Sequence, residues 1–334
     1  GLLSGWTNLL SESAGDADTH VLLEDVRFSG SAGILAPGGR GFTVRRVALR
    51  VGGAGIWVGD WARVEGCDVL ALGKSRSGDG IVVGDNSSVI DSRVESGRDG
   101  INGGDASMVV DSIVEGSGRN GINLGGSSHV HRSTADAIES PDTSGSSVGI
   151  DASTVSFSDG RSPSNGIRGT NVSFSTGLGG EFYGIEGNNV SFSHGSAPVV
   201  GLGHASGRGG GTIVTSSSGS GEERGITAKN VFNSYGRIYE SDIETDVIGI
   251  SAELVLNSAG EIVYDFESEY SAGIRASIAT SSYGSEQRGL FSEAAASSIT
   301  ATLGVGSFGV EDASDTIGSM DIDYPYNVPT LSSP

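Results

Sequence analysis

Acidic and basic side chains recur at one position in three successive segments of this chain, and this recurrence is its strongest sign of chemistry. Asp79, Asp99 and Asn120 each stand directly before a Gly-Ile pair, and Arg98 and Arg119 accompany the last two. Carboxylates stacked about 5 Å apart repel one another, so that one pKa rises or a cation is recruited. Asp79, Asp99, Arg98 and Arg119 are therefore the candidate residues for chemistry.

Two further pairs of aspartates recur with the same period. Asp85 and Asp105 share one position, and Asp91 and Asp111 share another. Carboxylate oxygens are ligands of Ca²⁺, so these four residues are the candidate metal ligands, and no other cofactor is indicated. The alternative interpretation is that all these columns hold solvated turn residues.

Other site motifs are incomplete. Leu72-Gly73-Lys74-Ser75 resembles the end of a phosphate-binding loop, but the first glycine that such a loop requires is replaced by Asp68. His129 and His131 would point to one side of a strand, yet no third ligand stands at a suitable spacing. Cys67 falls in a column of inward residues, which predicts a small buried core residue.

A glycine followed by an apolar residue marks a repeat along almost the whole chain. This marker occurs fourteen times, at intervals of 16 to 28 residues. The pairs are Gly33-Ile34, Gly55-Ile56, Gly80-Ile81, Gly100-Ile101, Gly121-Ile122, Gly149-Ile150, Gly166-Ile167, Gly184-Ile185, Gly201-Leu202, Gly225-Ile226, Gly249-Ile250, Gly273-Ile274, Gly289-Leu290 and Gly309-Val310. Because a unit of this length cannot bury an apolar face alone, it must stack on copies of itself.

Fixed offsets inside each repeat predict short strands. Ile101 is followed at eight residues by Val109, at eleven by Ser112 and at thirteen by Val114, and the neighbouring repeats keep these offsets. The second half has lost three residues from one link. Phe157, Phe174 and Phe192 share a column, as do Asn171 and Asn189, which predicts aromatic stacks and amide ladders.

These features predict an all-β fold, a single-stranded parallel β-helix of about 14 to 15 coils. It is expected to be right-handed because parallel crossovers almost always are. We expect an N-terminal cap or lead-in over 1–20, the β-helix over 21–315, and a C-terminal cap or extended tail over 316–334.

The segment Gly80-Ile-Val-Val-Gly-Asp-Asn-Ser-Ser-Val-Ile-Asp-Ser-Arg-Val94 and its neighbours resemble the right-handed parallel β-helix superfamily, over roughly residues 20 to 315. Its members include pectate-lyase-like and polygalacturonase-like enzymes, phage tailspikes and many surface proteins. The resemblance implies that acidic strips hold calcium or supply a paired acid and base, with a basic residue assisting on a sugar acid. It also implies a homotrimer, because trimers are common among fibre members.

The chain departs from the enzymes of that superfamily. It contains no Asn-Thr-Asp, Asp-Asp, Gly-His-Gly or Arg-Ile-Lys. A lyase that used lysine as its base would have only Lys74 and Lys229 to choose from. The longest irregular links, 136–149 and 203–224, are where a substrate cleft would be built.

The charge of the chain restricts its partners. Forty-one acidic residues face twenty basic ones, for a net charge of -21. This surplus predicts repulsion from nucleic acid and anionic membranes, and no apolar run is long enough for a membrane-spanning helix. Many carboxylates with almost no lysine favour a halophilic source, and an ordinary acidic secreted protein is the alternative.

Fold and charge together favour a non-enzymatic extracellular or virion surface component, such as a fibre, spike or adhesin. Such a rod would present a rigid acidic surface to glycans or to cell-envelope or virion proteins. The alternative is a polysaccharide lyase or glycoside hydrolase that acts in a groove along the β-helix.

Overall fold

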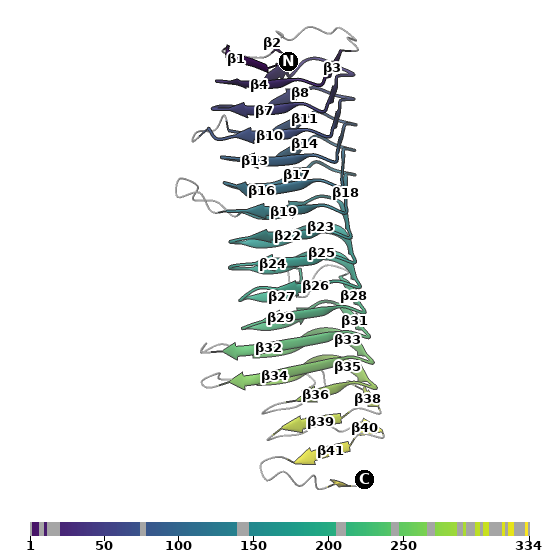
Figure 1. Cartoon of the computed structure of the whole chain (residues 1–334). Coiled ribbons are helices and arrows are strands. Elements are labelled where there is room, and N and C mark those ends of the chain that lie inside the picture. The colour runs from purple at the N-terminus through teal and green to yellow at the C-terminus, as the bar shows by residue number, and fades with distance from the viewer. Residues whose placement is uncertain are drawn as a thin grey trace. The chain divides into compact units, whose positions relative to one another are not determined.

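A computed structural model of the chain describes residues 2–6, 10–11, 21–73, 78–138, 147–204, 212–241, 247–265, 271–285, 290–291, 298–300, 303–306, 316–317, 320–323 and 331–332. The chain divides into two compact units, Gly1–Thr170 (unit 1) and Asn171–Pro334 (unit 2). Every regular element among the described residues is a strand, and they form a parallel β-solenoid of about 11 turns (Figure 1). The all-β parallel fold is confirmed, and it is consistent with a right-handed β-helix. Gly289 and Gly309, which mark two more of the predicted turns, lie outside the described residues.

Each turn of unit 1 contributes one strand to a first sheet, sheet A. Its strands are β1 (Leu2–Trp6), β4 (Arg27–Gly30), β7 (Ala48–Val51), β10 (Asp68–Ala71), β13 (Arg93–Ser96), β16 (Ile113–Ser117), β19 (Thr134–Ala137) and β22 (Asp159–Ser162).

Each turn of unit 1 contributes two strands to a second sheet, sheet B. The first strands of the turns are β2 (Leu10–Ser11), β5 (Ile34–Ala36), β8 (Ile56–Val58), β11 (Ile81–Val83), β14 (Ile101–Gly103), β17 (Asn120–Leu124) and β20 (Val148–Asp151). The second strands are β3 (Leu22–Glu24), β6 (Thr43–Arg45), β9 (Arg63–Glu65), β12 (Ser88–Ile90), β15 (Met108–Val110), β18 (His129–His131) and β21 (Thr154–Ser156). The next strand, β23 (Asn165–Ser173), includes the boundary between the units.

Unit 2 repeats this plan with a shorter link. Its sheet A contains β24 (Thr176–Gly179), β26 (His194–Ser196), β29 (Ser218–Gly221), β32 (Tyr235–Ser241), β34 (Ala259–Asp265), β36 (Tyr283–Ser285), β39 (Leu303–Gly306), β41 (Met320–Asp323) and β42 (Leu331–Ser332), the last of which pairs antiparallel with β41. Its sheet B contains β25 (Tyr183–Ser191), β27 (Val200–Gly203), β28 (Ile213–Thr215), β30 (Arg224–Thr227), β31 (Asn230–Phe232), β33 (Val247–Leu256), β35 (Ser271–Thr280), β37 (Leu290–Phe291), β38 (Ser298–Thr300) and β40 (Thr316–Ile317). In β25, β33 and β35 the loss of the link merges the two strands of a turn into one.

The register predicted from the offsets is confirmed in the core of unit 1. Ile101 pairs with Ile81 on one side and with Ile122 on the other, and all three side chains are fully buried. Val109 continues the Val89 column, and Val114 continues the Val94 column. Like residues thus lie over one another at the inter-strand spacing, and the column of apolar side chains forms the core.

The glycine of the marker is required by close packing between turns. A Cβ atom added to Gly100 would lie 2.1 Å from Cγ1 of Val114 and 2.5 Å from the carbonyl oxygen of Gly121. Any other residue there would push the next turn away, so the glycine belongs to the fold rather than to a site.

A left-handed backbone residue joins sheet B to sheet A in the turns of both units. The φ angle is 51° at Asp111 and 49° at Phe192, and it lies close to these values in the other turns. The members of this column, here called the bend column, are Asp25, Arg46, Gly66, Asp91, Asp111, Arg132 and Phe157 in unit 1, and Phe174, Phe192, Ser216, Asn233, Asn257 and Ser281 in unit 2. The sharp bend directs their side chains outward.

The residue after the bend is a buried serine in most turns. The Oγ atom of Ser112 donates to the carbonyl of Val110 at 2.9 Å and accepts from the amide of Ser92 at 3.3 Å. Equivalent bonds join the serines of neighbouring turns in each unit, so these buried hydroxyls are satisfied. Cys67 occupies the same position and is 2% exposed, and burial raises the pKa of its thiol. The prediction that Cys67 is a core residue is confirmed.

Among the described residues, none belongs to a helix that has the length and hydrophobicity needed to cross a bilayer.

Candidate functional site

Asp79, Asp99 and Asn120 form one column, as their spacing predicts, but Asp79 and Asp99 are buried and Asn120 is half-buried. They lie at the starts of β11, β14 and β17, where each side chain accepts a hydrogen bond from the next turn. Asp79 accepts from the amide of Asp99 at 3.4 Å, Asp99 from the amide of Asn120 at 3.2 Å, and Asn120 from that of Val148 at 3.2 Å. Asp79 is 9% exposed and Asp99 is 0% exposed.

Both aspartates are held by the arginines that the sequence singled out. Nε and Nη2 of Arg119 bind the two oxygens of Asp99 at 2.9 and 2.5 Å. Nε of Arg98 lies 2.5 Å from Oδ1 of Asp79 and 3.3 Å from Oδ2 of Asp99. The four side chains form one partly buried ion-pair network in which the carboxylates of Asp79 and Asp99 alternate with the guanidinium groups of Arg98 and Arg119.

The electrostatics of this network differ between its ends. Burial, together with the neighbouring charge of Asp99, raises the pKa of Asp79 although Arg98 opposes the shift. The hydrogen bond with Asp99 raises the pKa of the Arg119 guanidinium. The raised pKa of Asp79 would suit proton exchange. The oxygens of Asp99, by contrast, accept hydrogen bonds from Arg119 and from the amide of Asn120. A catalytic role for these four residues stays a prediction.

The carboxylates of the two candidate calcium columns differ in their hydrogen-bond partners. Oδ1 of Asp85 accepts from the amide of Asp105 at 2.8 Å, and Oδ1 of Asp105 accepts from the amide of Gly126 at 2.6 Å. Asp111 forms a two-bond pair with Arg132, at 2.6 Å each, while Asp91 stands one turn away on the bend column.

No three or more His, Cys, Asp or Glu side chains gather closely enough to hold a metal within the part of the chain that the structure describes. Nδ1 of His131 instead lies 2.8 Å from Oγ of Ser156. Lys74 and parts of the two irregular links, residues 139–146 and 205–211, are outside the described residues.

Unit 2 carries a groove that the sequence did not reveal. It runs along the corner between the bend column and the first residues of the strands of sheet A, and its volume is about 590 Å³. The residues that line this groove, here called the aromatic groove, are Phe174, Ser175, Thr176, Phe192, Ser193, His194, Ser216, Ser217, Ser218, Asn233 and Tyr235.

Aromatic rings form one wall of the aromatic groove. The rings of Phe174 and Phe192 stack with centroids 4.9 Å apart and an angle of 4° between their planes. Their side chains are 50% and 55% exposed. A bulky residue in a left-handed conformation costs about 1 kcal/mol relative to glycine or asparagine, and exposed rings recover little of it by burial.

The stack ends inside the groove. The next member of the bend column after Phe192 is Ser216, and then Asn233. Among the described residues, Phe192 makes no ring contact other than that with Phe174, so its second face looks over the small Ser216 side chain. This leaves a notch about one ring thick, because successive turns are about 4.8 Å apart.

Polar groups line the opposite wall of the aromatic groove. Nδ1 of the exposed His194 lies 2.7 Å from Oγ of Ser218, and the hydroxyl of Tyr235 donates to Glu261. His194, Ser218 and Tyr235 occupy one register position in consecutive strands. The groove therefore combines an apolar ring face with a row of hydrogen-bonding groups.

The sequence displayed the phenylalanine column but not its direction. The outward direction could have been predicted from the residue types at the same position in other turns. These are Asp, Arg, Ser and Asn, which are typical of side chains that face solvent. The stack of Asn189 on Asn171, joined at 2.9 Å, confirms the predicted amide ladder. No protein-family model, no curated protein and no solved structure matches this chain.

Proposed function

We propose that this protein is a non-enzymatic extracellular or virion surface component that binds glycans through the aromatic groove. The observation that carries the proposal is the uncovered face of the Phe192 ring over Ser216. A pyranose has an apolar face of C–H groups and a rim of hydroxyls, so it can stack on an aromatic ring and form hydrogen bonds at its edge.

The groove suits one sugar ring at a time. The ring would continue the Phe174 and Phe192 stack over Ser216, where no protein ring follows. Its hydroxyls would then lie near His194 and Ser218 on one side and near Asn233 on the other. The groove-lining side chains carry no carboxylate or guanidinium group, which favours a neutral sugar at this position.

Two variants test the proposal, with binding to a panel of immobilised glycans as the readout. Phe192→Asn removes the ring and introduces an asparagine. Asn233 shows that asparagine is accommodated at this position of the turn, with nearly the same φ angle. Ser216→Phe fills the notch by extending the stack. Both should abolish binding while the melting temperature changes little. Phe192→Asn loses a stack of about 1 kcal/mol and relieves backbone strain of similar size, whereas Ser216→Phe gains a stack and adds strain.

Asn257→Phe is the matched control for Ser216→Phe. It places a phenylalanine at another exposed position of the bend column, outside the groove-lining residues. Phe182→Ala is the control for the loss of an aromatic ring, since Phe182 is 46% exposed and does not line the groove. If Phe192→Asn and Ser216→Phe bind as well as the unmodified protein, the proposal is wrong.

Catalysis on polysaccharides is the alternative function, favoured by the raised pKa of Asp79. A lyase or hydrolase would release unsaturated or reducing ends from acidic polysaccharides, and Asp99→Asn would stop that release at a temperature where the variant is folded. We expect the unmodified protein to release none.

The chemistry of the surface leads us to propose a salt-rich extracellular environment. The excess of carboxylates over basic groups would be unfavourable at low ionic strength and tolerated at high ionic strength. Trimer assembly, contact with cell-envelope or virion proteins, and membership of the right-handed β-helix superfamily also remain proposals, supported by the repeat pattern.

A further inference from the structure

Two arginines in the described part of unit 1 differ from the others in their pairing. Among residues 21–73, 78–138 and 147–170, nearly every arginine has a carboxylate oxygen within 4.0 Å. The paired residues are Arg40, Arg45, Arg46, Arg63, Arg93, Arg98, Arg119, Arg132, Arg161 and Arg168. Arg27 and Arg50 are exposed and have no such partner within these residues.

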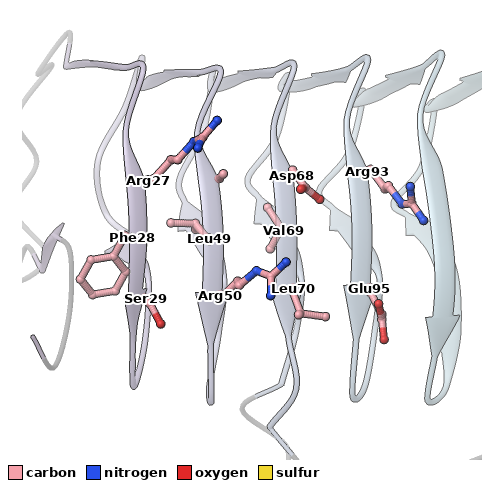
Figure 2. Close-up of a pocket in the computed structure, with 11 residues that line it drawn as sticks. Arg27, Phe28, Ser29, Leu49, Arg50, Asp68, Val69, Leu70, Arg93 and Glu95 are labelled. Carbon is pink, nitrogen blue, oxygen red and sulfur yellow. The ribbon is translucent and has the colours of Figure 1, made fainter. Parts of the chain in front are cut away.

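The two exceptions line the same groove. It lies on the outer face of sheet A across β4, β7, β10 and β13 and has a volume of about 380 Å³ (Figure 2). Figure 2 shows the guanidinium group of Arg27 extending toward β7 and that of Arg50 extending toward Leu70 on β10. The lining residues of this arginine groove are Arg27, Phe28, Ser29, Ala48, Leu49, Arg50, Asp68, Val69, Leu70, Arg93 and Glu95.

Strand register places the carboxylates of the same row two strands away from both arginines. Along one row of the sheet, Ala48 separates Arg27 from Asp68. Along the other, Leu70 separates Arg50 from Glu95. Each arginine is therefore about 10 Å, two strand spacings, from the nearest carboxylate of its own row. In a chain with twice as many acidic as basic residues, an apolar spacer at both positions leaves two guanidinium groups available.

The spacing of Arg27 and Arg50 suits a single anionic group. They stand on neighbouring strands and two residues apart in register, so their backbones are about 8 Å apart along the diagonal. The long side chains can close this distance, and a guanidinium group binds a carboxylate or sulfate through two parallel hydrogen bonds.

The other end of the arginine groove has the opposite character. Nη2 of Arg93 is bound to Glu115 at 2.6 Å, while Asp68 and Glu95 present carboxylates. These carboxylates would repel a second anion but accept hydrogen bonds from hydroxyl groups. The groove is thus polarised, with a site for one negative charge at Arg27 and Arg50 and acceptors for hydroxyls beyond Leu70.

We propose that the arginine groove binds an acidic saccharide, one that carries a carboxylate or a sulfate. Its anionic group lies between Arg27 and Arg50, and its ring lies over Ala48 and Leu70. The saccharide class rests on the proposed function, whereas the charge of the ligand rests on the two unpaired arginines alone.

Isothermal titration tests the site with four probes at low salt: an alginate trimer, its methyl ester, sulfated lactose and lactose. We expect at least one acidic probe to bind and both neutral probes to fail at this site. The alginate and sulfated-lactose arms distinguish a carboxylate from a sulfate ligand. Arg27→Gln and Arg50→Gln should each weaken binding by about tenfold or more, since each removes a charge-assisted contact.

Arg63→Gln is the matched control, because Arg63 is an exposed arginine already bound to Glu65 at 2.9 Å and does not line the groove. It should bind like the unmodified protein. Absence of binding by both acidic probes, or equal binding by Arg27→Gln, Arg50→Gln and Arg63→Gln, would overturn the proposal. Phe192→Asn should leave acidic-probe binding to the arginine groove intact, so a failure of the aromatic groove is distinguishable from a failure of this site.

Discussion

Arg119 and Asp99 form a two-bond ion pair in which the carboxylate has no contact with solvent. The bonds measure 2.9 and 2.5 Å, and Asp99 also accepts the amide of Asn120 at 3.2 Å. Asp111 and Arg132 form a pair of the same two-bond geometry that is exposed. The two pairs share this geometry and differ in burial and in the additional contacts that Asp99 makes with Asn120 and Arg98. Comparing them measures the joint effect of burial and of these contacts.

Asp99→Asn should destabilise the protein strongly. The substitution replaces one oxygen of a carboxylate that is 0% exposed with an NH2 group, which cannot accept the hydrogen bonds that Arg119 and the amide of Asn120 donate. Leaving buried hydrogen-bonding groups unsatisfied costs about 1 to 3 kcal/mol, and more where a charged group is involved. Urea denaturation followed by circular dichroism measures the loss.

Asp111→Asn is the control, and it should shift the urea midpoint far less because water screens the exposed pair. Equal losses in the two variants would show that burial does not set the strength of these pairs.

Ser112→Ala should cost about 1 to 3 kcal/mol, because the buried amide of Ser92 loses its acceptor. Ser29→Ala, which truncates an exposed serine of β4, should be nearly neutral. Thermal unfolding of both variants compares them directly. A neutral Ser112→Ala would mean that the serine column does not contribute to stability.

The stability contributed by Asp79 should fall as pH rises. Burial raises its folded-state pKa above the unfolded value of about 3.9, so the favourable contribution is complete below that value and is lost as pH rises through the folded pKa. The unmodified protein should therefore lose stability relative to Asp79→Asn as pH rises above about 4.

Asp111 provides the opposite sign. Its hydrogen bonds with Arg132 lower its pKa, so its contribution is present above the unfolded value and is lost as pH falls through the folded pKa. Melting temperatures should be compared with those of the unmodified protein from acidic to neutral pH. The advantage of the unmodified protein over Asp111→Asn should shrink as pH falls below about 4, whereas its stability relative to Asp79→Asn should fall as pH rises above about 4. Parallel curves would contradict the assignment.

Salt should stabilise the protein well beyond physiological concentration. The screening length falls from about 10 Å at 0.1 M to about 3 Å at 1 M salt, which reduces the mutual repulsion of a net charge of -21. Exposed ion pairs weaken at the same time, but each contributes little. Melting temperatures in sodium chloride from dilute to molar concentration provide the measurement, and a flat or falling curve would remove the halophilic proposal.

The repeat offsets predicted the strands and their register because each residue in a stacked solenoid meets its counterpart one turn away. Ile101 pairs with Ile81 and Ile122, as the shared offset requires. The glycine before Ile101 was equally predictable, since the space that it leaves is filled by the next turn.

The amino-acid sequence by itself thus determined the parallel fold, the core columns, the buried Cys67 and the grouping of Asp79 with Asp99. Only the tertiary structure decided which of these columns face solvent. The repeat spacing in the sequence predicts which residues are neighbours in successive turns, but the direction of a side chain depends on the backbone angles at the bend. The positive φ at Phe192 turns its ring outward, and a similar bend at Asp111 exposes its pair with Arg132, while Asp99 lies at a turn where the carboxylate is buried. The pairing of arginines likewise depended on register across neighbouring strands, which is why Arg27 and Arg50 became distinctive only in three dimensions.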